Sequence, residues 1–167
     1  MDTEADYVYT GDGPVPRDVT SVRFHPAVKA IPNETFYRCT ELKEVKLCEG
    51  HKTIGKEAFR NCTSLEIIKI PSTVMMIDNR ACVGCGGLRQ VKLCEGLKTI
   101  GGAAFAECVS LKLIRIPSTV IRTHDHAFGY CTELKEVKPL SVSRRLEVQH
   151  LRAVVHWRVL KSLPPSP

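Results

Sequence analysis

The apolar residues of this chain recur at a fixed interval of 23 residues. Leucines occupy one position of the pattern, phenylalanines a second and cysteines a third. The clearest members are Leu42, Leu65, Leu88, Leu111 and Leu134; Phe36, Phe59, Phe105 and Phe128; and Cys39, Cys62, Cys85, Cys108 and Cys131. Val19 begins the leucine series, and Cys82 takes the phenylalanine position of the middle unit. A repeat of this length indicates a solenoid, in which each unit buries its apolar face only against its neighbours.

Each unit divides into two apolar segments separated by turns. The first, as in residues 42–47, reads L-x-x-V-x-L with a basic residue between its last two apolar positions, which is the alternation of a strand with one buried face. Turn dipeptides such as Glu49-Gly50 and Pro71-Ser72 follow. The second segment, as in residues 54–62, is predicted to form a short helical turn, because Phe59 and Cys62 would then lie on one face. The pattern predicts about five to six units that share one parallel sheet.

The two ends of the chain depart from the repeat. Residues 1–18 are acidic, and Tyr7-Val8-Tyr9 is predicted to form a short strand that caps the stack, since a solenoid end otherwise exposes its core. The repeats are expected over residues 19–141. Residues 142–167 are predicted to form a C-terminal capping helix, with apolar residues at helical spacing up to residue 161, and a disordered Pro-rich tail. The alternative is that this last part is an unrelated segment that packs poorly.

Residues 42–74, LKEVKLCEGHKTIGKEAFRNCTSLEIIKIPSTV, resemble the BspA-type leucine-rich repeat, which is found in bacterial and protist proteins. The resemblance covers roughly residues 19–141, and several positions match in five consecutive units. It implies an α/β leucine-rich-repeat solenoid with a parallel β-sheet on one face and short helical turns or strands on the other. Members of this family are generally described as surface or adhesion proteins or as protein-binding modules, so the resemblance also implies a non-enzymatic role.

Composition adds an excess of basic residues. The chain has 24 lysines and arginines against 18 acidic residues, a net charge of +6, and the acidic residues of the first 18 positions make the repeats more basic than this total. The N-terminus resembles neither a secretory signal nor a transit peptide, and no stretch approaches the roughly 18 apolar residues of a membrane span. We therefore expect a cytoplasmic protein with free thiols rather than disulfides.

The basic position of the strand segment recurs in every unit and gives the main candidate binding surface. Its members are Arg23, Lys46, Lys69, Lys92, Arg115 and Lys138, and a second position of the same segment adds Lys43, Arg89 and Lys112. Stacked strands bring like charges to within about 5 Å, where each pair repels by roughly 1 kcal/mol or less in water. One interpretation is a surface for an acidic partner. The other is that long basic side chains only solvate the sheet and discourage edge pairing.

Three further groups are weaker candidates for chemistry. Cys82-Val83-Gly84-Cys85 matches the C-x-x-C pattern of redox and zinc sites, but the repeat accounts for both cysteines as packing residues. His124-Asp125-His126 suggests a metal or catalytic pair within a variable polar loop that has no recognisable third ligand. Cys48 and Cys94 follow their strands and are the more plausible oxidation-sensitive thiols, but we favour the interpretation that each is a small residue tolerated in a duplicated turn.

The sequence therefore predicts a non-enzymatic module that binds another protein or an acidic macromolecule through its basic strand face. No cofactor, metal, small-molecule substrate or membrane span is predicted, and nucleic acid is disfavoured because aromatic residues make up only 6% of the chain. The alternatives are a surface or adhesion protein that binds glycans, a redox or metal protein that uses Cys82 and Cys85, homotypic assembly through the C-terminal end, and a decayed fragment of a larger repeat family.

Overall fold

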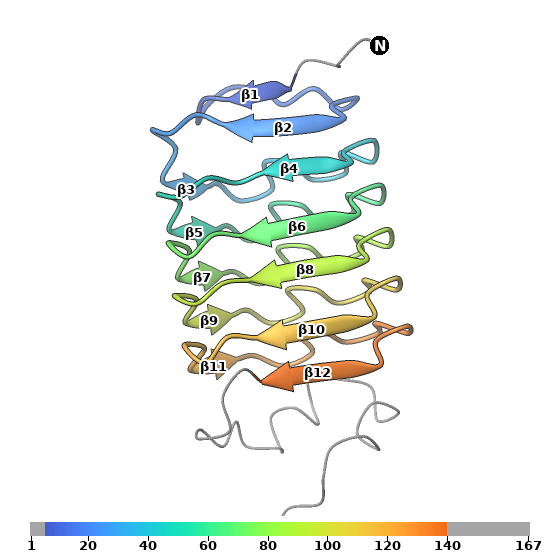
Figure 1. The fold of residues 1–167 in the computed structure, drawn as a ribbon. Coiled ribbons are helices and arrows are strands. Elements are labelled where there is room, and N and C mark those ends of the chain that lie inside the picture. Colours follow the sequence, from blue (N-terminus) through green and yellow to red (C-terminus); the bar gives the residue numbers. More distant parts are fainter. Residues whose placement is uncertain (1–5, 140–167) are drawn as a thin grey trace, which may run out of the picture.

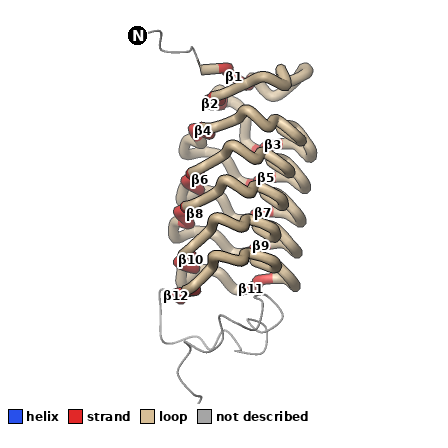
Figure 2. Tube along the Cα trace, turned by 90° about the vertical axis from the view of Figure 1, so that its right-hand side faces the viewer, coloured by secondary structure: helices blue, strands red, loops and turns tan. Residues whose placement is uncertain are grey.

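The computed structural model describes residues 6–139, which form a stack of coils (Figure 1). Each complete coil has a longer strand on one side and a strand of two residues on the other, and Figure 2 shows the two sets along separate edges of the stack. The longer strands are β1 (Tyr7–Tyr9), β2 (Ser21–Phe24), β4 (Glu44–Lys46), β6 (Ile67–Ile70), β8 (Gln90–Leu93), β10 (Leu113–Ile116) and β12 (Glu136–Pro139). The short strands are β3 (Ala30–Ile31), β5 (Thr53–Ile54), β7 (Met76–Ile77), β9 (Thr99–Ile100) and β11 (Arg122–Thr123).

Paired strands are parallel and come from neighbouring coils. The short strands form one sheet in the order β11-β9-β7-β5-β3, which we call the back sheet. The longer strands form the front sheet, in which β1-β2-β4-β6-β8 pair in one group and β10-β12 in another. Within the repeats, the register places each residue beside the residue 23 positions later, as with Val45 and Ile68. The parallel solenoid predicted from the repeat is confirmed, but its front sheet is interrupted between β8 and β10.

The interior consists of columns of equivalent side chains. The rings of Phe36 and Phe59 stack with centroids 5.3 Å apart, and Cys82 is fully buried in the same column. At the N-terminal end, Tyr9 packs edge-on against Phe24 and Phe36 at 5.7 Å in each case. The strand predicted at residues 7–9 is therefore present as β1, and it covers the apolar face of the first coil.

The cysteine column is bonded to the backbone of the stack. The Cys62 thiol donates to the Phe36 carbonyl at 3.2 Å, and the Cys85 thiol donates to the Phe59 carbonyl at 3.0 Å. Cys108 and Cys131 repeat this contact one coil further along each time. The thiols thus join successive coils as well as filling the interior.

The segments predicted as helical turns have a different conformation, and residues 6–139 contain no helix. Each of these segments has two residues with positive φ, such as Glu57 at 56° and Asn61 at 60°, and left-handed residues of this kind interrupt a right-handed helix. Every second backbone N–H of the segment points along the stack instead, while those of Ala58 and Arg60 bond within the segment. Phe59 donates to the Ala81 carbonyl at 2.7 Å and Asn61 to the Val83 carbonyl at 2.9 Å. We call these coil-to-coil bonds the turn ladder; they take up the donors that a helix would have used internally.

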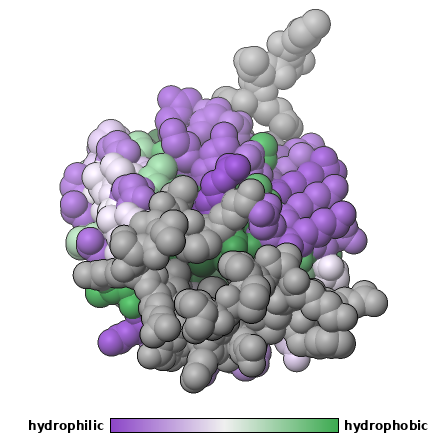
Figure 3. Space-filling model, turned by 60° about the horizontal axis from the view of Figure 1, so that its bottom comes forward, coloured by the Kyte–Doolittle hydropathy of each residue, from purple (hydrophilic) through white to green (hydrophobic). Residues whose placement is uncertain are grey.

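The predicted capping helix and Pro-rich tail lie outside the described residues. Figure 3 views the stack from its C-terminal end, where hydrophobic atoms lie between hydrophilic groups at the rim. In residues 6–139, no helix is long and apolar enough to cross a membrane.

One polar side chain replaces an apolar residue inside the stack. His51 is fully buried. The equivalent residues of the other coils are Val28, Val74, Leu97 and Val120. The His51 Nδ1 lies 2.8 Å from the Cys48 carbonyl and therefore carries the ring proton, while Nε2 has no hydrogen-bond partner in the described part of the chain. A buried acceptor without a partner costs about 1–3 kcal/mol.

We expect His51→Leu to stabilise the protein by about 1–2 kcal/mol, because it removes this unpaired acceptor and restores the apolar residue of the column. Guanidinium unfolding followed by circular dichroism measures the change. The reverse substitution at the equivalent position two coils later, Leu97→His, should destabilise the protein by a similar or larger amount. A loss of stability in His51→Leu would contradict this account and assign the imidazole a stabilising role.

Candidate binding surface

The basic residues of the front strands form one exposed row. The register places Arg23 beside Lys46, and Lys69 beside Lys92. Along strands such as β2 and β8, the basic residue lies between two buried residues, so its side chain points to the outer face of the sheet. We use the name basic row for its five members with described side chains, all of them exposed: Arg23, Lys46, Lys69, Lys92 and Arg115. Lys138 continues the row along the backbone, in register with Arg115.

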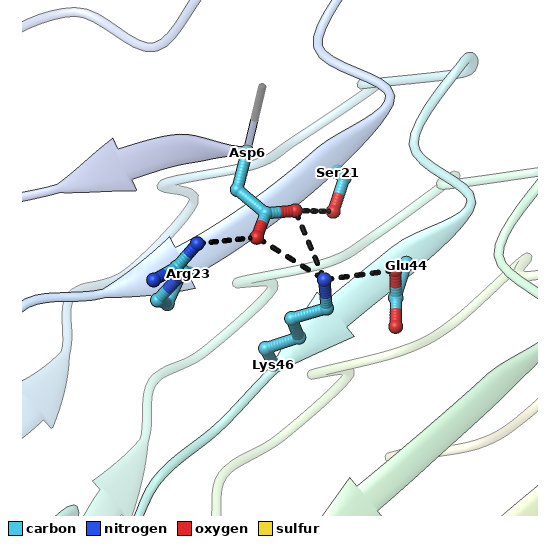
Figure 4. A network of polar contacts seen from close by, with 5 residues as sticks. All are labelled: Asp6, Ser21, Arg23, Glu44 and Lys46. Carbon is cyan, nitrogen blue, oxygen red and sulfur yellow. Dashed lines mark hydrogen bonds and ion pairs between the residues drawn. The ribbon is translucent and has the colours of Figure 1, made fainter. Parts of the chain in front are cut away.

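An acidic residue just before β1 neutralises the N-terminal end of the basic row (Figure 4). The Asp6 carboxylate accepts hydrogen bonds from the Ser21 hydroxyl, from the Arg23 guanidinium at 2.8 Å and from the Lys46 ammonium at 3.1 Å. Only 10% of the Asp6 side chain is exposed. The hydrogen bond from Ser21, followed by those from Arg23 and Lys46, holds the pKa of Asp6 well below its usual range. Glu44 adds a second contact to Lys46 at 3.3 Å.

The rest of the row has no such compensation. Lys69, Lys92 and Arg115 form no ion pair with any residue in 6–139. Beside them, Arg89 lies 3.7 Å from Glu66, with both side chains more than half exposed, and a pair of this kind contributes little. Lys112 is exposed and likewise unpaired within the described range. Uncompensated positive charge therefore gathers over β6, β8 and β10.

The front sheet is interrupted where these cations gather. β8 and β10 are not paired, whereas β6 and β8 are, and Figure 1 shows β8 and β10 as neighbours on the front side. The back strands of the same coils, β9 and β11, stay paired, so the interruption is confined to the front side. A hollow of about 390 Å³ opens there. Its lining residues are Arg89, Gln90, Val91, Lys92, Leu93, Lys112, Leu113 and Arg115. We call this hollow and its two flanking strands the seam.

At Gly87 the β8 coil lies close to the coil before it. Its N–H donates to the Thr63 carbonyl at 3.0 Å, and a Cβ at this position would lie only 2.4 Å from that oxygen. The equivalent residue of the next coil, Ser110, makes no such bond to the β8 coil in the described structure. This coil-to-coil hydrogen bond is thus present at the step before β8 and absent at the step after it in the described structure.

The C-x-x-C cysteines are packing residues. Cys82 and Cys85 are fully buried. The hydrogen bond with Cys62 lowers the pKa of Cys85, but the hydrogen bond with Cys82 and burial outweigh it and hold this pKa well above its ordinary value. Because the thiolate is the reactive and metal-binding form, this environment opposes redox or metal chemistry.

The histidine pair lies in an exposed loop after β11. His124, Asp125 and His126 are all exposed. Across residues 6–139, no group of three potential metal ligands comes together.

Sequence reasoning overlooked two features of the surface. One is the pairing of Asp6 with the basic row, for which the signal was an acidic residue directly before a predicted strand. The other is a second set of exposed lysines, Lys29, Lys52 and Lys98, at the start of the back strands. These lysines also recur at 23-residue steps, interrupted by Met75.

Comparison with known proteins identifies the repeat. The sequence matches the family model described as the BspA type Leucine rich repeat region, in six copies over residues 16–137. No curated protein matches the sequence.

Solved structures share the fold. A leucine-rich repeat protein from Bacteroides ovatus is 34% identical, over 72% of this chain and 30% of its own, with a TM-score of 0.62. The T. pallidum Leucine Rich Repeat protein is 29% identical over 74% of this chain and 56% of its own, with a TM-score of 0.64. The pneumococcal vaccine antigen PcpA, at 23% identity over 79% of this chain and 34% of its own with a TM-score of 0.67, shows the fold alone. This chain spans less than two thirds of the length of each of these structures.

Asp6→Asn is expected to lower stability near neutral pH, because it removes the carboxylate that holds Arg23 and Lys46. The pKa of Asp6 is depressed in the folded state. Its contribution is therefore fully present above the ordinary carboxyl pKa of about 3.9 and is lost as the pH falls below it. Thermal unfolding of wild type and variant should differ most near pH 7 and converge below about pH 4. Glu41→Gln, with the same change of charge on an exposed residue, is the control. A difference that stays constant with pH would contradict the role of Asp6.

Thiol reactivity should separate two cysteines from the other six. Cys48 and Cys94 are half-buried, whereas the remaining six are buried. Burial raises the pKa of Cys131 to about 11, and burial together with the neighbouring Cys85 and Cys131 raises that of Cys108 well above its ordinary value. Titration of the native protein with a disulfide reagent should show two fast thiols, which Cys48→Ser/Cys94→Ser removes, and six that react only on unfolding. Fast reaction of Cys85 would contradict this assignment.

Proposed function

This chain belongs to the BspA-type leucine-rich repeat family, and we propose that it is a non-enzymatic interaction module that binds an acidic protein partner through its basic row. The observation that supports this function is a run of three consecutive, exposed and unpaired cations on one sheet face, Lys69, Lys92 and Arg115. Lys43, Arg89 and Lys112 extend the positive surface beside them.

Electrostatics favours an acidic partner for this run. Parallel strands hold equivalent residues about 4.8 Å apart, at which distance like charges repel by roughly 1 kcal/mol or less per pair in water. The protein itself relieves this repulsion at Arg23 and Lys46 with the Asp6 carboxylate. A partner that brings carboxylates to the remaining cations relieves it in the same way. Many shallow contacts of this kind add up along the surface of a solenoid.

Two features favour a protein over other polyanions. The cations at the seam surround apolar groups of Val91, Leu93 and Leu113, and an apolar centre with a polar rim is the usual anatomy of protein interfaces. None of the outward-facing residues in the described front strands is aromatic, so the surface lacks the stacking groups with which proteins hold single-stranded nucleic acid. A sulfated or uronic glycan complements the positive charge but does not supply apolar groups to pack on the apolar centre.

Lys69/Lys92/Arg115→Ser should bind a polyglutamate resin more weakly than the wild type and elute at clearly lower salt. Each exposed pair contributes about 0.2–1 kcal/mol, so three together contribute on the order of 1–3 kcal/mol at low ionic strength. Lys29/Lys52/Lys98→Ser, which removes the same charge from the other side of the stack, is the matched control and should elute close to the wild type. If both triple variants shift equally, retention follows net charge and the basic row is not a binding surface.

A further inference from the structure

We propose that the seam is a carboxylate-recognition site, where Lys92, Arg115 and Gln90 together hold an acidic side chain of a partner peptide. This inference rests on the proposed function and narrows it to one place on the front sheet. Its basis is a comparison between the seam and the Asp6 contact, which shows within this same molecule how the front sheet binds a carboxylate.

The Asp6 contact has three donors with a simple arrangement. Two are consecutive members of the basic row on neighbouring strands, Arg23 and Lys46. The third, Ser21, is a neutral donor that lies two residues before Arg23 on the same strand and also faces outward. The carboxylate therefore sits over two adjacent strands, between two cations and beside one neutral donor (Figure 4).

The seam repeats this arrangement. Lys92 and Arg115 are consecutive members of the basic row, on β8 and β10. Gln90 lies two residues before Lys92, faces outward as Ser21 does, and offers an amide N–H₂ where Ser21 offers a hydroxyl. All three line the hollow. No acidic side chain of residues 6–139 forms an ion pair with either cation.

The other described steps of the basic row lack one of these parts. Between Lys46 and Lys69, the residue equivalent to Ser21 is Glu44, whose own carboxylate contacts Lys46 at 3.3 Å. Between Lys69 and Lys92, the equivalent residue is Ile67, which has no donor and is 49% exposed. Within the described row, the seam is therefore the step that combines two cations lacking a carboxylate partner with a neutral hydrogen-bond donor.

The hollow makes this step accessible. A side chain that enters the hollow reaches the apolar groups of Val91, Leu93 and Leu113 that line it. Those groups suit the methylene part of an aspartate or glutamate side chain, which an inorganic anion lacks. Arg89 and Lys112 at the rim attract the acidic residues that flank it. Charge-assisted hydrogen bonds in a partly enclosed site are stronger than exposed ion pairs.

The first test supplies the seam with its own carboxylate. Gln90→Glu should weaken binding of a short fluorescein-labelled oligoglutamate peptide about tenfold or more, measured by fluorescence anisotropy, because the new carboxylate occupies Lys92 as Glu44 occupies Lys46. The fold tolerates glutamate at this position of the front strands, as Glu44 shows. Ala30→Glu adds the same charge to an exposed residue of the back sheet and should change the affinity by less than about twofold.

The second test compares steps of the basic row. Lys92→Ser and Arg115→Ser should each weaken peptide binding about tenfold, whereas Lys69→Ser should have an effect of about twofold or less, as expected for a single exposed ion pair. Sodium phosphate at matched ionic strength should displace the peptide no better than sodium chloride, because free phosphate makes no use of the apolar groups.

The outcomes separate this inference from the function on which it rests. If the peptide binds and all three single variants weaken it equally, the basic row binds acidic partners but the seam has no special role. If phosphate displaces the peptide efficiently, the seam is a general anion site, and the carboxylate assignment is wrong. If wild type and Lys69/Lys92/Arg115→Ser bind the peptide alike, the proposed function itself fails.

Discussion

Each coil of this protein can bury its apolar side chains only against the coil before it and the coil after it. That constraint requires every interior residue to pack on its own repeat equivalent, as Phe36 does on Phe59. It also explains the cysteine column, since a small thiol fits between coils and its S–H reaches a carbonyl of the preceding coil, as Cys85 reaches Phe59. The hydrophobic core, the thiol contacts and the turn ladder are three consequences of one fixed register.

The same register that stacks apolar residues also stacks charges. Inside the molecule, stacking one apolar residue on its equivalent is favourable. On the outer face, the same register places one cation beside the next. Asp6 resolves the conflict for Arg23 and Lys46, and its low exposure shows that the contact belongs to the folded structure. Further along the row, the repulsion among Lys69, Lys92 and Arg115 is not compensated. The surface proposed to bind a partner is thus the part of the sheet where stacking leaves repulsion unrelieved.

Periodicity was sufficient to predict the parallel front strands, the buried columns and the outward direction of the basic row, because all of these follow from equivalent residues occupying equivalent places. It failed for the turn segments. The spacing of Phe59 and Cys62 fits a helix, but positive φ at residues such as Glu57 has no signature in the sequence, since only Gly84 among the ten equivalent residues is a glycine. The seam also could not be predicted from the sequence, because it depends on how closely one coil approaches another. Gly87 was visible in the sequence, but its contact with Thr63 was not.

The seam also has a mechanical meaning. A pull along the axis of the stack loads the hydrogen bonds that join one coil to the next, and every step resists through its front strands, its back strands and its turn ladder. At the step between β8 and β10 the front strands contribute no pairing, while β9 and β11 remain joined. Under tension the coils would part there first, opening on the basic face and swinging about the back sheet. Within residues 6–139, the step with the fewest strand hydrogen bonds to resist such a load would therefore be the step over which the unpaired cations gather.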